Sequence, residues 1–214
     1  MSLPEPYYVS EDGRITIYHG DCLELLPLVD GAVMVTDPPY GLEELAGSYG
    51  RHGDTIANDR DTTTRAAVLE MWGARPVLMF STPRLPEPPG DWEHRLVWDK
   101  VEPGLNGGPW RYTHENVFVR GDGWARPDAS SFSVLRFRAG NGSPDRALHP
   151  HRKPVELMRA LLRAAPPGLI VDPFMGSGTT LRAAADLGRS AIGIEYEEIY
   201  CERAVERLRQ GVLL

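Results

Sequence analysis

Cysteine is scarce in this chain, and several other features are missing. Only Cys22 and Cys201 occur among the 214 residues, which excludes a disulfide framework and a cysteine-based metal cluster. No apolar run reaches the ~18–20 residues that a membrane-spanning helix needs. The N-terminal stretch lacks the basic start and apolar segment of a secretory signal. We therefore expect a cytoplasmic protein with no membrane partner and no bound metal.

An excess of basic residues is also absent, because the formal net charge is −7. This total argues at first against a nucleic acid partner, but the charges are unevenly distributed. Residues 1–80 carry 5 basic and 13 acidic side chains, whereas residues 120–163 carry 9 basic and 4 acidic ones. A phosphate backbone interacts with local rather than total charge. On charge alone, a nucleic acid surface and an arginine-rich solvated face both stay open.

Patterns typical of strands and helices alternate along most of the chain. The expected strands lie at 14–18, 31–37, 76–83, 94–100, 114–121, 131–138, 168–174 and 189–196. The expected helices lie at 22–28, 62–74, 154–165, 179–188 and 197–210. This alternation predicts an α/β protein with a mainly parallel sheet. We expect one domain over residues 1–214, with a short insertion at about 100–148, where the alternation breaks.

Two stretches carry candidate functional residues, and the first is Asp37-Pro38-Pro39-Tyr40 after the strand at 31–37. By itself it fits a proline turn that stops a strand as well as it fits a working site. The polar, glycine-rich segment 41–61 follows it and predicts a long loop. That loop is expected either to close over a ligand or to be a disordered surface loop.

The second stretch is the glycine turn at 170–180, which follows an apolar strand and opens a helix. Gly176 and Gly178 let a ligand approach the backbone, but the spacing matches neither common phosphate-binding loop and no lysine follows. Asp172 before the glycines would repel phosphate and attract an ammonium group. Glu195 ends the next strand, where an acid is placed to accept hydrogen bonds from ribose hydroxyls. S-adenosylmethionine has the ribose and the cation that such a site needs.

These segments together resemble the amino-directed DNA methyltransferases, which act on adenine N6 or cytosine N4. The turn "DPFMGSGTT" with "GIE" after it is similar to their cofactor motifs, and "DPPY" to their catalytic motif. "HPHRKP" at 149–154 and "YHGD" at 18–21 are similar to two further family segments. The catalytic motif precedes the cofactor motif, which resembles the β group of the family. The resemblance spans about residues 14–208.

The resemblance implies a Rossmann-like methyltransferase fold in circularly rearranged order, with a seven-stranded sheet whose last strand is antiparallel. It also implies that Asp21 contacts the adenine of S-adenosylmethionine and that Lys153 contacts its carboxylate. The expected cofactor-binding residues are Asp21, Cys22, Lys153, Asp172, Pro173, Phe174, Gly176, Ser177, Gly178, Thr179 and Glu195. The expected catalytic residues are Asp37, Pro38, Pro39 and Tyr40.

Methyl transfer to a base amine needs the nitrogen lone pair localised, and acceptors for the two amine protons achieve this. The Asp37 carboxylate is one such acceptor, and the carbonyl of Pro38, held by two prolines, is the second. Tyr40 offers a stacking face for a base that has been flipped out of the duplex. Because family members with Asp at the first position mostly act on adenine N6, we expect that target.

The expected partner is double-stranded DNA. The residues expected to contact it are Tyr49, Arg51, Arg126, Arg136 and Arg138, with Arg120, Arg146 and Arg152 in the same basic stretch. Because the region between the two motifs is shorter than is usual in the family, a homodimer on a palindromic site is a further expectation. Cytosine N4, an RNA base, a protein amide nitrogen and a binding module without catalysis stay open as alternatives, although Asp37 disfavours RNA and protein.

Overall fold

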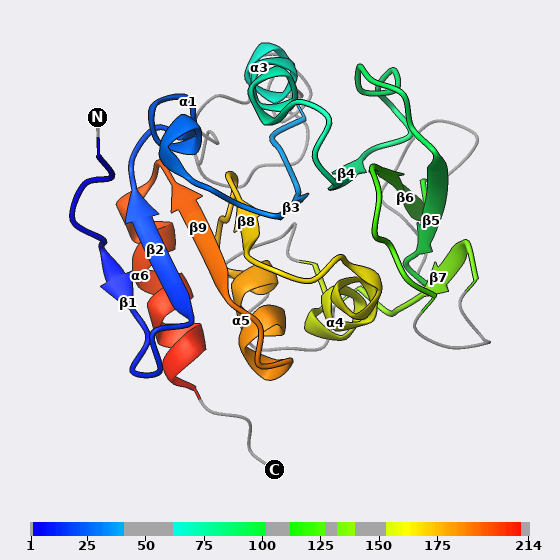
Figure 1. The fold of residues 1–214 in the computed structure, drawn as a ribbon. Coiled ribbons are helices and arrows are strands. Elements are labelled where there is room, and N and C mark those ends of the chain that lie inside the picture. Colours follow the sequence, from blue (N-terminus) through cyan, green and yellow to red (C-terminus); the bar gives the residue numbers. More distant parts are fainter. Residues whose placement is uncertain (1, 41–61, 102–111, 127–131, 140–152, 211–214) are drawn as a thin grey trace, which may run out of the picture.

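The computed structural model describes residues 2–40, 62–101, 112–126, 132–139 and 153–210. All strands in this part of the chain belong to one sheet, in the order β1-β2-β9-β8-β3-β4-β6-β5-β7 (Figure 1). The strands are β1 (Tyr8–Val9), β2 (Ile15–His19), β3 (Val33–Thr36), β4 (Val77–Ser81), β5 (His94–Asp99), β6 (His114–Arg120), β7 (Val134–Arg136), β8 (Ile170–Asp172) and β9 (Ala191–Glu195). The helices are α1 (Cys22–Leu25), the 3-10 turn η1 (Leu26–Leu28), α3 (Thr63–Trp72), α4 (Val155–Ala164), α5 (Thr179–Asp186) and α6 (Glu198–Arg209).

The predicted alternation and the mainly parallel sheet are confirmed. Strands β2, β9, β8, β3 and β4 form consecutive parallel pairs. Strand β6 is antiparallel to both of its neighbours, β4 and β5, and β7 is parallel to β5. Every helix and strand expected from the sequence is present within one or a few residues of its predicted bounds.

The predicted count of seven strands, one of them antiparallel, is wrong in detail. Nine strands are formed in the described part of the chain, and both β1 and β6 run against their neighbours. The strands beyond the expected seven are β1 and β7, which are short and lie at the two edges of the sheet. Strand β1 folds back on β2 across a tight turn in which Ser10 N–H donates to the Ile15 carbonyl (2.9 Å) and Gly13 adopts φ 70°. A two-residue strand of this kind has no periodicity for the sequence to reveal.

The expected insertion at 100–148 is partly built into the sheet. Strand β6 lies within these residues and is hydrogen-bonded on both sides, and β7 extends the edge beyond β5. The remainder of this stretch includes segments outside the described residues. That it forms a target-recognition insertion within a single domain stays a prediction.

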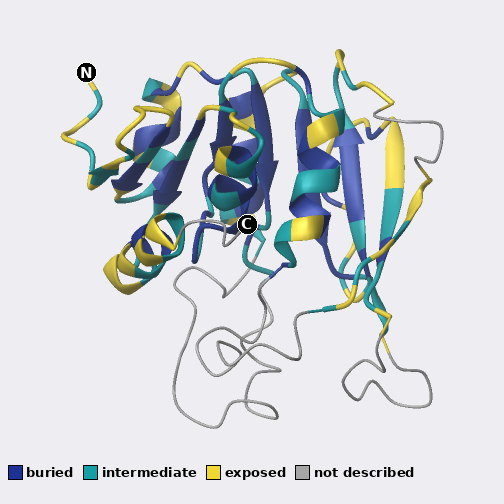
Figure 2. Cartoon of the chain, turned by 90° about the horizontal axis from the view of Figure 1, so that it is seen from below, coloured by how far each residue is buried: buried dark blue, intermediate teal, exposed yellow. Residues whose placement is uncertain are grey.

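Helices cover both faces of the sheet (Figure 1). Helices α4, α5 and α6 pack on one face over a cluster that includes Val33, Val35 and Phe80. Helices α1 and α3 pack on the other face over a cluster that includes Met34 and Met79. Because both faces are covered, β3 and β4 are buried at every position and are apolar apart from their last residues. Figure 2 shows the buried central strands, with exposed positions on the outer sides of the helices and on the edge strands.

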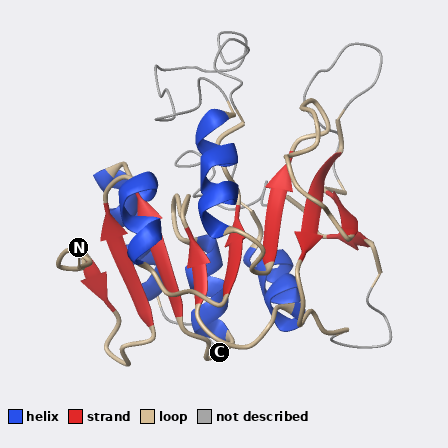
Figure 3. Ribbon diagram, turned by 45° about the horizontal axis from the view of Figure 1, so that its top comes forward, coloured by secondary structure: helices blue, strands red, loops and turns tan. Residues whose placement is uncertain are grey.

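The direction of the strands places the functional motifs together. Parallel strands connected by helices end at a common edge, called here the carboxyl edge (Figure 3). Asp37, Asp172 and Glu195 lie at or next to the ends of β3, β8 and β9, which are neighbours in the sheet. The opposite edge, where these strands begin, is called the amino edge.

Among the described residues, none of the helices has the length and apolar character of a membrane span.

Gly31 allows the chain to enter β3 beneath α3. A Cβ atom at this position would lie 2.3 Å from Cγ2 of Val171 and 2.7 Å from Cη2 of Trp72. We therefore expect Gly31→Ala to lower the free energy of unfolding by about 1–3 kcal/mol, because overpacking outweighs the gain from a stiffer unfolded chain. Urea unfolding measures this, with Asp30→Ala at the exposed neighbouring position as the control. Equal stabilities of the two variants would contradict the packing described.

Candidate active site

Four acidic residues follow or end four adjacent strands at the carboxyl edge. In sheet order they are Asp21 after β2, Glu195 on β9, Asp172 on β8 and Asp37 after β3. Ligands of parallel α/β sheets bind outside the carboxyl ends of the strands. The structure therefore brings together residues that are up to 174 positions apart in the sequence, from Asp21 to Glu195.

Asp37 and Tyr40 are hydrogen-bonded to each other. The Tyr40 hydroxyl donates to Asp37 Oδ1 at 2.6 Å, and Glu115 Oε2 lies 3.3 Å from the same hydroxyl as an alternative acceptor. Burial raises the pKa of Tyr40 well above its ordinary value, and the charges of Asp37 and Glu115 raise it further. The hydroxyl therefore stays a donor that orients the Asp37 carboxylate. Pro38 is buried and Pro39 is half-buried, and the roles expected of the Pro38 carbonyl and the Tyr40 ring stay predictions.

Lys153 contacts the same carboxylate from the start of α4. Its ammonium forms an ion pair with Asp37 Oδ2 and a second one with Glu115 Oε2 at 3.0 Å. Lys100, which follows β5, reaches Glu115 Oε1 at 2.7 Å. Two of the three N–H donors of Lys153 thus have carboxylate partners, and its expected contact with a cofactor carboxylate stays a prediction.

Glu115 and Lys100 are site residues that the sequence reasoning missed. The sequence of β6 does indicate a buried position for Glu115, because this residue alternates with Val117 and Val119 and so lies on the same inward face. A carboxylate on the buried face of a strand needs partners. Burial by itself would raise the pKa of Glu115, but Lys153 and Lys100 together outweigh it and hold that pKa below its ordinary value.

Asp172 is buried at the end of β8 and is surrounded by donors. Thr36 Oγ1 donates to its Oδ1 at 2.7 Å, and the N–H of Phe174 donates to the same oxygen at 3.2 Å. Thr180 supplies a further side-chain hydrogen bond. Burial nevertheless raises the pKa of Asp172 to about 6. The Thr36 contact connects β8 to the last residue of β3, directly before Asp37.

The glycine turn lies between β8 and α5. Gly176 and Gly178 have φ angles of 52° and 76°, in the left-handed region that favours glycine. A Cβ at Gly176 would meet nothing within 4 Å, whereas one at Gly178 would lie 2.8 Å from Cβ of Ala204. Gly176 therefore borders open space for a ligand, and Gly178 allows close packing of α6. Ser177 and Thr179 of this turn are buried, and Pro173 and Phe174 lie between it and Asp172.

Glu195 and Asp21 complete the edge beside the glycine turn. Glu195 Oε2 accepts from the N–H of Gly176 and Oε1 from the N–H of Glu197, both at 2.8 Å, and burial raises the pKa of this carboxyl. Asp21 caps α1 by accepting from the N–H of Leu23 at 2.8 Å, with Cys22 buried beside it. The N–H of Gly20 donates to the Glu195 carbonyl, which brings the two motifs together.

The arginines expected at DNA are placed in two different regions. Arg136 ends β7 toward the carboxyl edge, with a 77% exposed side chain 3.4 Å from Asp99, and Arg138 follows it and is also exposed. Arg126 follows Ala125, whose N–H donates to the carbonyl of Ala164 at the end of α4, and so lies toward the amino edge. Tyr49, Arg51, Arg146 and Arg152 lie outside the described residues, as do His149 and His151.

Arg120 lies at the edge opposite to the acidic residues described above, and its expected DNA contact stays a prediction. Strand β6 runs antiparallel to β4, so Arg120 at its end lies at the amino edge. Its guanidinium donates to the Gly73 carbonyl at 2.8 Å, at the end of α3. Positive charge near a helix C-terminus is stabilising there, so Arg120 has a structural role. The sequence gives the charge of Arg120 but not the direction of the strand that carries it.

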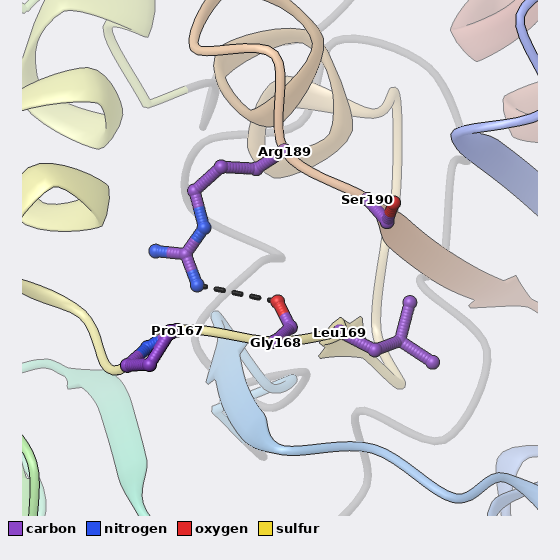
Figure 4. Close-up of a pocket in the computed structure, with 5 residues that line it drawn as sticks. All are labelled: Pro167, Gly168, Leu169, Arg189 and Ser190. Carbon is purple, nitrogen blue, oxygen red and sulfur yellow. Dashed lines mark hydrogen bonds between the residues drawn. The ribbon is translucent and has the colours of Figure 1, made fainter.

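A hollow at the amino edge is separate from these residues. It is lined by Pro167, Gly168, Leu169, Arg189 and Ser190, which precede β8 and β9 (Figure 4). The Arg189 guanidinium donates to carbonyls of this lining and of the end of α4, including Gly168 at 3.3 Å and Leu162 at 2.8 Å. Its donors therefore tie chain segments together, and this hollow is not part of the candidate site.

Comparisons with known proteins agree on one family. The sequence model of the family described as DNA methylase (N6_N4_Mtase) matches residues 77–206. The chain is 31% identical over 209 residues to the protein named "Putative methylase YubD" of Escherichia coli (strain K12), covering 88% of each chain.

Solved structures agree on the fold. The M1.HpyAVI–SAM complex matches with a TM-score of 0.66 and 21% identity, over 91% of this chain and 98% of that one. The PvuII DNA methyltransferase, which is cytosine-N4-specific, matches with a TM-score of 0.70 and 15% identity, over 98% of this chain and 91% of that one. At these identities the likeness shows a common fold alone.

The raised pKa of Asp172 predicts a specific dependence of stability on pH. A carboxyl whose pKa is higher in the folded state than its ordinary 3.8 favours folding at low pH, and this contribution is lost as the pH rises through about 6. Asp172→Asn resembles the neutral form. We expect urea unfolding of the two proteins to diverge between pH 4 and 7.5, with the wild type losing on the order of 2–3 kcal/mol relative to the variant. Parallel profiles would contradict the assignment.

Proposed function

Because this chain belongs to the amino-directed (N6-adenine or N4-cytosine) DNA methylase family, we propose that it methylates the exocyclic amine of a DNA base, with adenine N6 as the target. S-adenosylmethionine is the proposed methyl donor. The observation that carries the proposal is the position of Asp37 at the carboxyl edge, one strand away from Asp172 and the glycine turn. This arrangement sets a hydrogen-bond acceptor for an amine beside a site suited to a nucleoside with a cationic group.

The chain fits the proposed cofactor at three points. The open side of Gly176 leaves room for a ligand against the backbone. Glu195 already accepts two backbone N–H groups, and each of its oxygens keeps a lone pair for a ribose hydroxyl. Asp172 provides a buried negative charge for an ammonium group. When bound, S-adenosylmethionine supplies an electrophilic methyl group on a sulfonium.

Asp37 prepares the amine for attack on that methyl group. The lone pair of an exocyclic amine is delocalised into the ring, and acceptors for its two protons return it to the nitrogen. The Asp37 carboxylate is proposed to accept a hydrogen bond from one amine N–H, and the Pro38 carbonyl from the other. Tyr40 holds Asp37 in place through the 2.6 Å hydrogen bond. Because Tyr40 orients the carboxylate before the amine arrives, Asp37 itself does not have to turn toward it.

The choice of adenine over cytosine rests on Asp37. Family members that resemble this chain at the first catalytic position mostly act on adenine N6, and those with serine there mostly act on cytosine N4. The fold does not separate the two, since the cytosine-N4-specific PvuII enzyme has it too. Cytosine N4 is therefore the alternative target.

Duplex DNA is the proposed partner, with Arg136 and Arg138 contacting its phosphates. Arg136 ends β7 and Arg138 follows it, so both lie toward the carboxyl edge, as Asp37 does. Tyr49 and Arg51 are proposed to contact the flipped base region from the segment after Tyr40. Arg126 lies toward the other edge and is a weaker candidate. A homodimer stays a proposal that follows from the short reading region.

The proposed function is tested by methyl transfer from labelled S-adenosylmethionine to mixed-sequence duplex DNA. We expect label in DNA with the wild type and at least a 100-fold slower transfer with Asp37→Ala, because an acceptor for the developing charge is lost. Glu87→Gln, in an exposed ion pair with Arg95, is the control that keeps full activity. Label in RNA or protein but not in DNA, or equal rates for Asp37→Ala and wild type, would overturn the proposal.

Asp172 gives the proposed cofactor binding its own pH dependence. An ammonium beside Asp172 favours the ionised carboxylate, so we expect the affinity for the cofactor to weaken as the pH falls below about 6. Near pH 6 binding should release a proton. Calorimetry in two buffers of different ionisation enthalpy measures that proton, and Asp172→Asn should remove it. Proton uptake instead of release would contradict this position for the ammonium.

A further inference from the structure

Lysine is almost absent from this protein, and its few lysines share one place. Of the 23 basic residues, 21 are arginine, and the two lysines are Lys100 and Lys153. Both ammonium groups contact the carboxylate of Glu115, Lys100 on Oε1 at 2.7 Å and Lys153 on Oε2 at 3.0 Å. The other 21 basic side chains of the chain are arginines, so its lysines gather in this one cluster.

The surroundings of Lys153 suit a compact ammonium group. Its side chain is 6% exposed, and its ammonium lies 5.0 Å from the ring centre of Phe80, 5.8 Å from Tyr40 and 5.9 Å from Trp98. A compact ammonium fits between three rings and two carboxylates, whereas a planar guanidinium is larger. Unlike arginine, lysine can also change its charge when its partners change.

The charges of this cluster balance. Lys100 and Lys153 face Asp37 and Glu115, and burial alone would lower the pKa of Lys153. The two carboxylates outweigh that effect and hold the pKa above its ordinary value. The other ionisable groups nearby are the Tyr40 hydroxyl, Asp172, which interacts with Asp37, and Arg65 on α3, which interacts with Tyr40. Losing either carboxylate would leave a buried surplus cation.

Both oxygens of Asp37 already accept hydrogen bonds from the protein. Oδ1 accepts from Tyr40 and Oδ2 from Lys153. The ammonium of Lys153 thus donates an N–H to the same carboxylate that the proposed function offers to a base amine. An acceptor neutralised by a lysine is weaker, and the amine must compete with the lysine for it.

We propose that Glu115 is a positioning residue for methyl transfer, which holds Lys153 when the target amine takes its place on Asp37. This inference rests on the proposed function of Asp37. Glu115 is suited to the task because its Oε2 already contacts the ammonium, so that Lys153 moves between two partners without losing its charge. Lys100 fixes the other oxygen of Glu115 and so keeps Oε2 directed at Lys153.

The two lysines allow a test that does not depend on activity. Protein labelled with 13C-lysine gives two ε-methylene signals in an NMR spectrum, and Lys100→Met assigns them by removing one. We expect the Lys153 signal of Glu115→Gln to titrate at a lower pH than that of the wild type, because one of the two groups that raise its pKa is gone. An unchanged titration would overturn the coupling of Glu115 to Lys153.

Kinetics test whether this coupling serves the reaction. We expect Glu115→Gln to lower kcat at pH 7 at least 10-fold, with a cofactor affinity within about 3-fold of the wild type. The rate of the variant should rise with pH as Lys153 loses its proton, while the wild type stays flat over the same range.

Three results separate the explanations. If the wild type is inactive but the Lys153 signal still titrates at a lower pH in Glu115→Gln, the proposed function is refuted and the coupling of Glu115 to Lys153 stands. An active wild type with equal kcat for Glu115→Gln, or with a Glu115→Gln rate that does not rise with pH, refutes the positioning role. If Glu115→Gln does not fold, Lys100→Met with Glu115→Gln restores the charge balance and is expected to show the same loss and pH dependence. Glu87→Gln is the control.

Discussion

The parallel pairing of β3 with β8 is the constraint on which the site depends. It sets Val33 beside Ile170 and Met34 beside Val171, so that Asp37 and Asp172 emerge at one edge from halves of the chain far apart in sequence. The hydrogen bond from Thr36 to Asp172 joins the two strands where they end. Burial of both faces beneath helices fixes this register, since a slip by one residue would turn apolar side chains away from their cores. The distance between Asp37 and the glycine turn after β8 is therefore set by the pairing of these two strands.

Charge is arranged differently in the two halves of the edge. On the cofactor side, Asp172 and Glu195 are satisfied by hydroxyl and backbone N–H donors, and burial raises the pKa of each. This favours a cationic partner, which would relieve the cost of the charge. On the catalytic side, Asp37 and Glu115 face two ammonium groups and are balanced within the protein. In the proposed reaction, the incoming amine meets an acceptor that already binds Lys153, so catalysis depends on an exchange of partners at Asp37.

Much of this arrangement could be predicted from the sequence, for identifiable reasons. Long apolar runs and glycine turns gave the strands, the helices and the positions of Asp37, Asp172 and Glu195, because these signals are local. The partner of Lys153 could not be predicted, since Glu115 and Asp37 approach it only through the sheet order. The direction of β6 moved Arg120 to the amino edge, and that direction is a property of pairing rather than of composition. The two-residue β1 is too short to carry a pattern.

The proposed role of Asp37 is to prepare an exocyclic amine of DNA for methylation. Mapping modified bases in the DNA of a host that expresses the protein tests this role most directly. We expect N6-methyladenine at a defined sequence, in DNA that is unmodified there without expression, and no such mark with Asp37→Ala. Methylated cytosine N4 would change the base but keep the chemistry. DNA without any methylated amine, from a host containing folded protein, would contradict the claim.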